Sequence, residues 1–172
     1  MTSTADPTLR SFRDSDLEAL VAINDGAYPA VPITPVDEFT ALLAYSDLVL
    51  VVDDGEPAGF LLTMSPGLDY ASENYRWFSG RSDAFLYIDR IVLAPRLQGL
   101  GLGRRLYEAA FDAARSRGAR ELFAEVNLEP PNPGSLAFHA RMGFERIGEQ
   151  PTKDGAVVVA LLAAPVTAVT AG

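Results

Sequence analysis

Apolar residues recur along this chain with two periods, one typical of strands and the other typical of helices. A period of two predicts a strand, because successive side chains point to opposite faces of a sheet. Apolar residues three and four positions apart predict a helix with one buried face. The predicted strands are Thr8–Phe12, Leu48–Val52, Ala58–Met64, Phe85–Leu93, Glu121–Asn127, Phe144–Gly148 and Ala156–Leu162. The predicted helices are Asp14–Ala27, Val36–Ala44, Leu102–Arg117 and Ser135–Met142.

These strands and helices follow one another without strict alternation. Such an order predicts a mixed α/β (α+β) fold, with a mostly antiparallel central sheet and helices on both faces. In the third helix, the apolar stripe is expected to consist of Leu102, Leu106, Ala109 and Ala113.

Two segments lack a regular pattern. Ser65–Ser82 is rich in Gly, Ser and Asp and yet carries several aromatic residues, so we expect an irregular insertion. Long loops inside compact domains are often lids or binding loops, which favours a substrate-side wall over a structural flap. The tail Ala163–Gly172 is small and apolar, and we expect it to be disordered or to form an added edge strand.

Composition narrows the class of protein. With 172 residues, 48% of them hydrophobic, the chain fits a single domain over residues 1–172, with a core at about 7–162. The lack of cysteine and the single histidine, His139, exclude disulfides, a cysteine nucleophile and a metal site built from these residues. No apolar run of membrane-spanning length and no signal peptide are visible, so we expect a cytoplasmic protein without a membrane partner. The net charge of -9 argues against nucleic acid as a partner.

A glycine cluster joins the predicted strand Phe85–Leu93 to the next helix. Gly99, Gly101 and Gly103 let the backbone turn so that several N–H groups converge where a helix amino terminus adds positive potential. We therefore expect an anion site suited to a pyrophosphate. A Walker loop would need Lys and Ser or Thr after Gly103, where Arg104 stands, and a dinucleotide-binding loop would need a glycine where Leu106 stands.

Two sequence blocks point to coenzyme A instead. The block Gln98-Gly99-Leu100-Gly101-Leu102-Gly103 resembles the Gln/Arg-x-x-Gly-x-Gly/Ala motif of the GNAT N-acetyltransferase superfamily, and Leu93-Ala94-Pro95 resembles the exit from its fourth strand. The register that starts at Arg96 also fits the bare motif, but Pro95 and Leu106 are spaced correctly only when the motif starts at Gln98. Residues 132–144 resemble the Asn-x-x-Ala/Ser-x-x-Phe/Leu-Tyr-x-Lys/Arg-x-Gly-Phe block of the same superfamily. The resemblance covers about residues 7–162 and is strong over 85–144.

The resemblance implies the GNAT acyl-CoA N-acyltransferase fold, in which the fourth and fifth strands splay apart and the pantetheine arm lies between them. It also implies an enzyme that transfers the acetyl group of acetyl-CoA to a primary amine of a small molecule, amino acid or peptide by direct attack in a ternary complex. Two alternatives stay open: a catalytically idle acyl-CoA-binding sensor, and a homodimeric structural domain. We allow for a homodimer in each case. The cofactor-binding residues that the resemblance implies are Ile91, Val92, Leu93, Gln98, Gly99, Leu100, Gly101, Leu102, Gly103, Arg104, Asn132, Ser135 and Phe138.

Attack on a thioester requires a neutral amine, whereas free alkyl amines have pKa values of about 8 to 10.4. A base must therefore accept a proton. Glu125 is the first candidate, because the resemblance places it where relatives similar to ribosomal-protein N-terminal acetyltransferases carry theirs; its alternative is a solvent-facing strand position. Asp89 is the second candidate, since the period of two puts it on the same face as Ile91 and Leu93. Its alternative is an ion pair with Arg90 or with the loop at Arg76.

His139 stands where the superfamily usually has a tyrosine that protonates the departing thiolate. A histidine could do this because its ordinary pKa lies near neutrality, but packing or hydrogen bonding is the alternative. Asn132 is implied to contact coenzyme A and could instead be a turn residue. Tyr28, Tyr75 and Trp77 are candidates for the substrate wall, where aromatic rings would suit a cationic amine. Core packing is their alternative.

Overall fold

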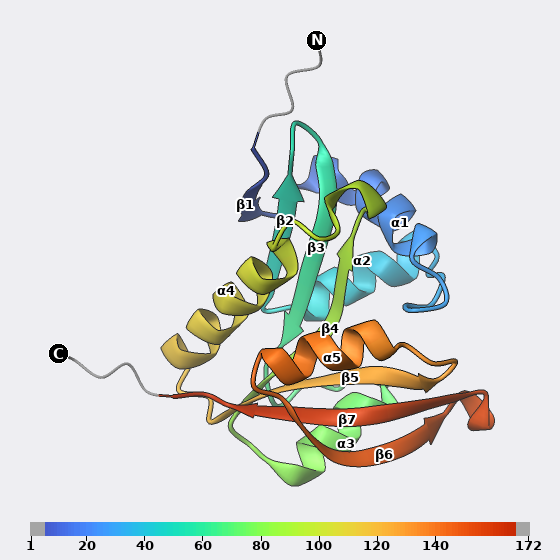
Figure 1. Ribbon diagram of the computed structural model, residues 1–172, viewed down its shortest axis with the longest axis vertical. Coiled ribbons are helices and arrows are strands. Elements are labelled where there is room, and N and C mark those ends of the chain that lie inside the picture. Colours follow the sequence, from blue (N-terminus) through green and yellow to red (C-terminus); the bar gives the residue numbers. More distant parts are fainter. Residues whose placement is uncertain (1–5, 168–172) are drawn as a thin grey trace, which may run out of the picture. The chain divides into compact units, whose positions relative to one another are not determined.

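The computed structural model describes residues 6–167 of the chain (Figure 1). The strands are β1 Thr8–Ser11, β2 Leu48–Asp53, β3 Pro57–Met64, β4 Phe85–Leu93, β5 Glu121–Glu129, β6 Glu145–Thr152 and β7 Val157–Pro165. The α-helices are α1 Leu17–Gly26, α2 Val36–Tyr45, α3 Glu73–Arg81, α4 Leu102–Ser116 and α5 Pro133–Arg141. Short 3-10 turns occupy Asp14–Asp16, Pro95–Leu97 and Lys153–Gly155.

The strands are ordered β1-β2-β3-β4-β5-β7-β6 in one sheet. The pairs β1/β2, β2/β3, β5/β7 and β6/β7 are antiparallel, and β4/β5 is parallel. The parallel ladder joins Phe85, Leu86 and Tyr87 to Glu121, Leu122 and Phe123. Both strands continue beyond the last of these pairs, β4 to Leu93 and β5 to Glu129. The mixed, mostly antiparallel sheet expected from the sequence is confirmed.

The described residues form two compact units. The first contains residues 6–63 and 89–106, and the second contains residues 64–88 and 107–167. Strand β4 and helix α4 each begin in one unit and end in the other.

In the first unit, α1 and α2 each bury one face. Leu20 and Asn24 of α1 are buried and lie four positions apart, as expected for one helix face. On α2, Phe39 packs edge-on against Phe60 of β3, with ring centroids 5.6 Å apart. Pro29, Pro32 and Pro35 lie between the two helices, which confirms the expected break around Tyr28.

An ion-pair cluster joins β1, the turn before α1 and the end of β2. Arg10 donates two hydrogen bonds of 2.8 Å to the carboxylate of Asp16 and one of 2.7 Å to Asp53. The side chain of Asp16 is almost completely buried. These bonds with Arg10 hold the pKa values of Asp16 and Asp53 below the usual range for an aspartate.

Replacing Arg10 with methionine is expected to destabilise the protein by about 2 to 4 kcal/mol at pH 7, between the values for an exposed and a fully buried ion pair. The lowered pKa values make this stabilisation complete above about pH 3.9, the ordinary aspartate value, and it is lost as the pH falls further. Urea denaturation at pH 7 and pH 3 should therefore show a smaller difference at the lower pH. Arg120→Met, which removes an exposed pair with Asp83, is the matched control. Equal losses of unfolding free energy in Arg10→Met and Arg120→Met would contradict the prediction.

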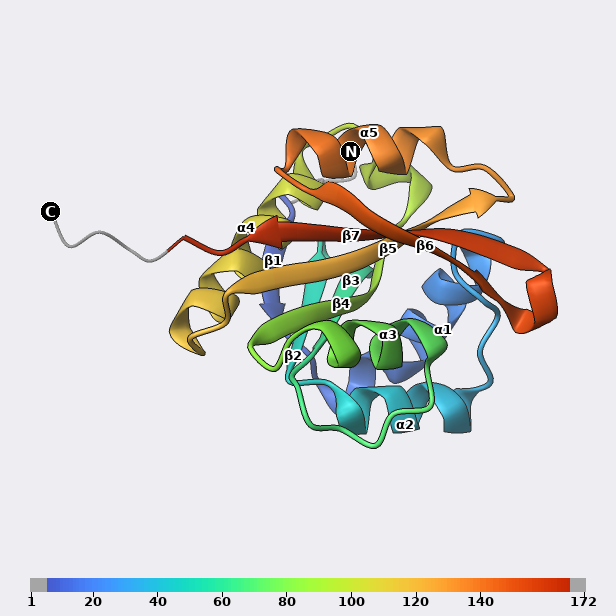
Figure 2. The same cartoon turned by 90° about the horizontal axis from the view of Figure 1, so that it is seen from below.

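In the second unit, β5, β7 and β6 lie between two helices, with α5 on one face and α3 on the other (Figure 2). Phe123 of β5 stacks on Phe78 of α3 at 4.5 Å between ring centroids. On β6, a side chain at Gly148 would come within 2.9 Å of the Trp77 ring, so glycine allows this close approach. Helices on both faces are therefore observed within this unit.

Three details of the sequence prediction are wrong. The expected irregular insertion contains helix α3, which Ser72 caps by accepting a hydrogen bond from the backbone of Tyr75. The tail does not begin at Ala163, because β7 runs to Pro165 and pairs with β5 there, inside the sheet instead of at its edge; residues 168–172 lie outside the described range. In α4 the buried residues are Leu102, Leu106, Tyr107, Ala110 and Ala114, so Ala109 and Ala113 were assigned one position too early.

Candidate active site

The glycine cluster forms the turn that leads into α4, within the first unit. Gly99 and Gly101 have φ angles of +80° and +77°, a region that side chains with a Cβ rarely adopt. The N–H of Arg105 bonds to the carbonyl of Gly101 at 3.2 Å and closes the first helical turn. By helix geometry, the N–H groups of Leu102 and Gly103 have no acceptor inside the helix. This is the arrangement that binds anions at helix amino termini.

The start of this loop is fixed to the turn between β2 and β3. Arg96 forms an ion pair with Asp54 at 3.0 Å and another with Glu56 at 3.3 Å. The N–H of Ala94 bonds to the carbonyl of Ala58 at 2.8 Å. Because Arg96 is engaged away from the glycines, these contacts favour the motif register that starts at Gln98. Of the predicted loop residues, Leu102 is buried and the residues Gln98, Gly99, Leu100, Gly101 and Arg104 are exposed.

The end of β4 is packed closely against β3. A side chain at Gly59 would lie 2.8 Å from both the carbonyl oxygen of Val92 and the side chain of Leu93. Glycine at this position therefore allows the backbone of β3 to approach that of β4. Ile91 and Leu93 are half-buried and Val92 is buried.

Asp89 forms the ion pair that was the alternative to a base. Its carboxylate lies 3.4 Å from Nε of Arg90, and both side chains are largely buried. Arg90 also donates to Asn24 of α1 at 2.9 Å and to Thr34 at 2.7 Å. Arg90 thus connects β4 to the segment that contains Tyr28. The contact favours the structural interpretation of Asp89, and its role as a base stays a prediction.

Glu125 lies on β5 in the second unit and is half-buried. It shares a strand face with Phe123, which stacks on α3. The hydroxyl group of Tyr87 donates to its carboxylate, with 2.8 Å to Oε1 and 2.8 Å to Oε2. The structure therefore brings Glu125 together with a buried tyrosine that the sequence did not single out.

His139 is 4% exposed and hydrogen-bonded through both ring nitrogens. Nδ1 lies 2.7 Å from the carbonyl oxygen of Ser135, and Nε2 lies 2.5 Å from the hydroxyl oxygen of Tyr107. A carbonyl oxygen only accepts, so Nδ1 carries the proton and Nε2 accepts from Tyr107. Burial lowers the pKa of His139, although the bond to Ser135 opposes this shift, and burial raises the pKa of Tyr107. Both groups are neutral in this pair, which favours the hydrogen-bonding interpretation of His139; its acid role stays a prediction.

The other predicted residues of the second block surround this pair. Asn132 caps α5, because its side chain accepts a hydrogen bond from the backbone of Ser135 at 3.4 Å. This is a local structural role, as in the alternative from the sequence. Phe138 packs edge-on against Tyr107 at 5.2 Å between ring centroids.

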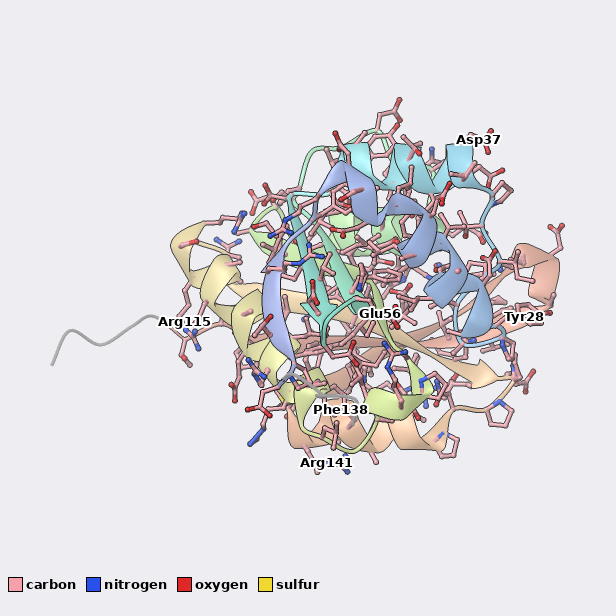
Figure 3. The ribbon with its side chains drawn as sticks, turned by 90° about the horizontal axis from the view of Figure 1, so that it is seen from above. Tyr28, Asp37, Glu56, Arg115, Phe138 and Arg141 are labelled. Carbon is pink, nitrogen blue, oxygen red and sulfur yellow. The ribbon has the colours of Figure 1, made fainter. Side chains whose placement is uncertain are left out.

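The three predicted substrate residues have different surroundings. Tyr75 is 1% exposed and its hydroxyl group donates to the carbonyl of Ser65 at 2.7 Å, which places it in the core of the second unit. Trp77 is half-buried and packs over Gly148. Tyr28 is 64% exposed in the first unit, beyond the end of α1 (Figure 3). Tyr28 is thus the member of this group with a surface open to a ligand.

Sequence reasoning missed Tyr87 and Tyr107. The period of two that grouped Asp89 with Ile91 and Leu93 also includes Tyr87, so a signal for it was present. Tyr107 contacts His139, but the spacing of residues along α4 gave no signal for this contact. Within residues 6–167, no group of three acidic, histidine or cysteine side chains is placed to hold a metal ion. None of the described helices has the length and apolar character to cross a membrane.

Comparison with known proteins adds a family and several relatives. The model of the acetyltransferase (GNAT) family matches residues 17–144. The streptothricin acetyltransferase of Streptomyces lavendulae is 32% identical over 174 residues, covering 86% of this chain and 87% of the relative. The aminoglycoside N(6')-acetyltransferase type 1 of Stenotrophomonas maltophilia is 28% identical over 142 residues, covering 81% of this chain and 86% of the relative.

A solved structure shows the same fold. The protein yncA of Salmonella typhimurium, whose structure includes its cofactor acetyl-CoA, has a TM-score of 0.69 at 20% identity. The match covers 98% of each chain. The observed arrangement of strands and helices is therefore one that also occurs in a protein that binds acetyl-CoA.

Proposed function

The chain belongs to the GNAT family of N-acetyltransferases, and we propose that it transfers the acetyl group of acetyl-CoA directly to a primary amine of a small molecule in a ternary complex. The observation that carries this proposal is the turn at Gly99 and Gly101, which begins α4 with positive φ angles. A turn of this kind at a helix amino terminus suits the pyrophosphate of coenzyme A. Backbone groups of Ile91 to Leu93 are proposed to bind the pantetheine arm.

The proposed reaction uses Glu125 as the base. The amine nitrogen attacks the carbonyl carbon of the thioester, and Glu125 accepts a proton from the nitrogen directly or through water. An N–H group near Leu93 stabilises the negative charge that develops on the carbonyl oxygen. The carbon–sulfur bond then breaks, giving the acetylated amine and the thiolate of coenzyme A, which takes up a proton. His139 is a proposed source of that proton once its Nε2, which accepts a hydrogen bond from Tyr107 in the neutral pair, has taken up a proton from solvent.

The acceptor class follows from the relatives and from charge. The two relatives are named for streptothricin and for an aminoglycoside, and aminoglycosides are cationic amines. This chain carries a net charge of -9, and Tyr28 and Asp37 both lie at the surface, at separate places (Figure 3). An aromatic ring and carboxylates suit a cationic amine. We therefore propose a cationic small-molecule amine as the acceptor.

A thermal-shift and thiol-release screen of acyl-CoA donors against amines tests this function. Acetyl-CoA at about 100 times its dissociation constant is expected to stabilise the protein by about 2.7 kcal/mol, which raises the melting temperature by about 5 to 10 °C. At least one cationic amine should release free thiol. Stabilisation without turnover for any amine would favour an idle acyl-CoA sensor, and no stabilisation by any acyl-CoA would contradict the proposal.

A further inference from the structure

We propose that Tyr87 is a positioning residue for acetyl transfer, because its hydroxyl group holds the carboxylate of Glu125 ionised and in a fixed orientation. The inference rests on the proposed function, in which Glu125 is the base. Its basis is the contact between β4 and β5 together with the packing of α3, all within the second unit.

The contact between Tyr87 and Glu125 is symmetrical. The hydroxyl oxygen lies 2.8 Å from each carboxylate oxygen. A phenol has one proton and an ionised carboxylate only accepts, so Tyr87 donates a hydrogen bond that the two oxygens share. The geometry thus matches the ionised state that a base needs before it accepts a proton.

Helix α3 fixes the ring that makes this bond. Tyr87 is completely buried, and its ring centroid lies 5.8 Å from that of Tyr75 and 5.6 Å from that of Phe78. Tyr75 is fixed in turn, because its hydroxyl group donates to the carbonyl of Ser65 and accepts from the N–H of Leu68. With its ring packed in this way, Tyr87 keeps its hydroxyl group directed at Glu125. The segment between β3 and β4, which contains α3, therefore holds Tyr87 in place next to the proposed base.

The groups on the surrounding elements determine how the protonation of Glu125 depends on pH. On β7 the partner of Glu125 is the apolar Leu161. On α4, Tyr107 stays neutral because burial and the charge of Glu125 both raise its pKa. On α5, burial lowers the pKa of His139 and keeps the ring neutral near pH 7.

On α3, Arg81 lies 3.5 Å from Glu121, at the beginning of β5, and an arginine keeps its charge at every pH of an activity assay. The other titratable group that α3 packs into this cluster is Tyr75, whose hydroxyl group is bonded to Ser65. Tyr87 donates to the carboxylate of Glu125 itself. A bond donated to the charged form favours that form, so its loss should make Glu125 easier to protonate.

The test is Tyr87→Phe, which keeps the ring and removes the hydroxyl group. The acid limb of the pH profile of kcat/KM is expected to move to higher pH by about one unit. At the pH optimum, kcat should fall by about 3- to 10-fold, with the KM for acetyl-CoA changed by less than about 2-fold. In a Glu125→Gln background, the same change should lower kcat by less than about 2-fold, because the residue acts through Glu125.

Tyr75→Phe is the matched control. It removes a buried hydroxyl group from the same aromatic cluster, but that group bonds to Ser65 and Leu68 instead of Glu125. The melting temperature should fall, and the acid limb should stay in place. An equal shift of the acid limb in both variants would mean that loss of packing, and not the bond to Glu125, is the cause.

A measurement that needs no turnover separates this inference from the proposed function. The carbon-13 signal of the Glu125 carboxyl group should titrate at higher pH in Tyr87→Phe than in the unmodified protein. An unmoved titration would overturn the role of Tyr87, whatever the enzyme acetylates. A moved titration with an unmoved acid limb, or full activity in Glu125→Gln, would overturn the assignment of Glu125 as the base and with it the role of Tyr87 in acetyl transfer.

Discussion

Replacing Glu125 with glutamine is expected to lower kcat for acetyl transfer by about 100- to 10,000-fold, the usual contribution of a general base. Glutamine has nearly the same shape and can still accept a bond from Tyr87, but its amide does not take up a proton at neutral pH. The KM for acetyl-CoA should change little, because the loop proposed to bind coenzyme A lies elsewhere in the sequence, at residues 98–103. Steady-state thiol release at a saturating amine concentration measures both quantities.

Glu121→Gln provides the control for this substitution. Glu121 lies on the same strand and on the same strand face, four residues before Glu125, and forms an ion pair with Arg81 at 3.5 Å. Its replacement removes the same charge from the same strand. We expect kcat to change by less than about 3-fold, because no proton transfer depends on this residue. Similar losses in both variants would point to the charge of β5 as the cause and would contradict Glu125 as the base.

The local parts of this structure were predictable from the sequence. The glycine turn depends on backbone angles at Gly99 and Gly101, which residues with a Cβ rarely adopt, so the residue type itself carries the information. The break between α1 and α2 follows in the same way from three prolines. The strand and helix order came from short-range periodicity. Each of these features is fixed by residues within a few positions of one another.

The insertion before β4 shows where composition misleads. Its Gly, Ser and Asp content favoured an irregular loop, and yet Tyr75 and Phe78 are three positions apart and both face the core. Ser72 stands before them as a helix cap. The sequence prediction missed α3, although its cap and the spacing of its aromatic residues indicate a helix. Tertiary burial of one aromatic face outweighs the low helix propensity of its other residues.

The candidate site was predictable only in part, because its contacts join distant residues. Glu125 was found from its motif, but its partner Tyr87 is 38 residues away. That pairing depends on the parallel register that sets Tyr87 opposite Phe123, which no local pattern determines. The bond between Tyr107 and His139 likewise depends on how α4 packs against α5. For Asp89, by contrast, the ion pair with its sequence neighbour Arg90 was one of the predicted alternatives.

Replacing Gly101 with alanine is expected to raise the dissociation constant of acetyl-CoA by about 10-fold or more. At φ +77° an alanine costs about 1 to 2 kcal/mol, so the turn either stays strained or rearranges. Nothing within the protein lies within 4 Å of where the new Cβ would stand, so the methyl group would point into the space in which the bound phosphates are proposed to lie. A tenfold change corresponds to about 1.4 kcal/mol of binding free energy. Isothermal titration with coenzyme A measures it.

Gly118→Ala is the control that separates binding from strain. Gly118 has a φ angle of +71° and likewise has no atom within 4 Å of where a methyl group would stand, but it lies two residues after the end of α4, whereas Gly101 directly precedes the first residue. The backbone penalty should be similar in the two variants, so their losses of unfolding free energy should agree within about 1 kcal/mol. Only Gly101→Ala should bind coenzyme A more weakly. The two substitutions differ in their place on the helix and not in backbone strain. A similar loss of coenzyme A affinity in both variants would therefore be an effect of lower stability, and it would contradict the glycine turn as the pyrophosphate site.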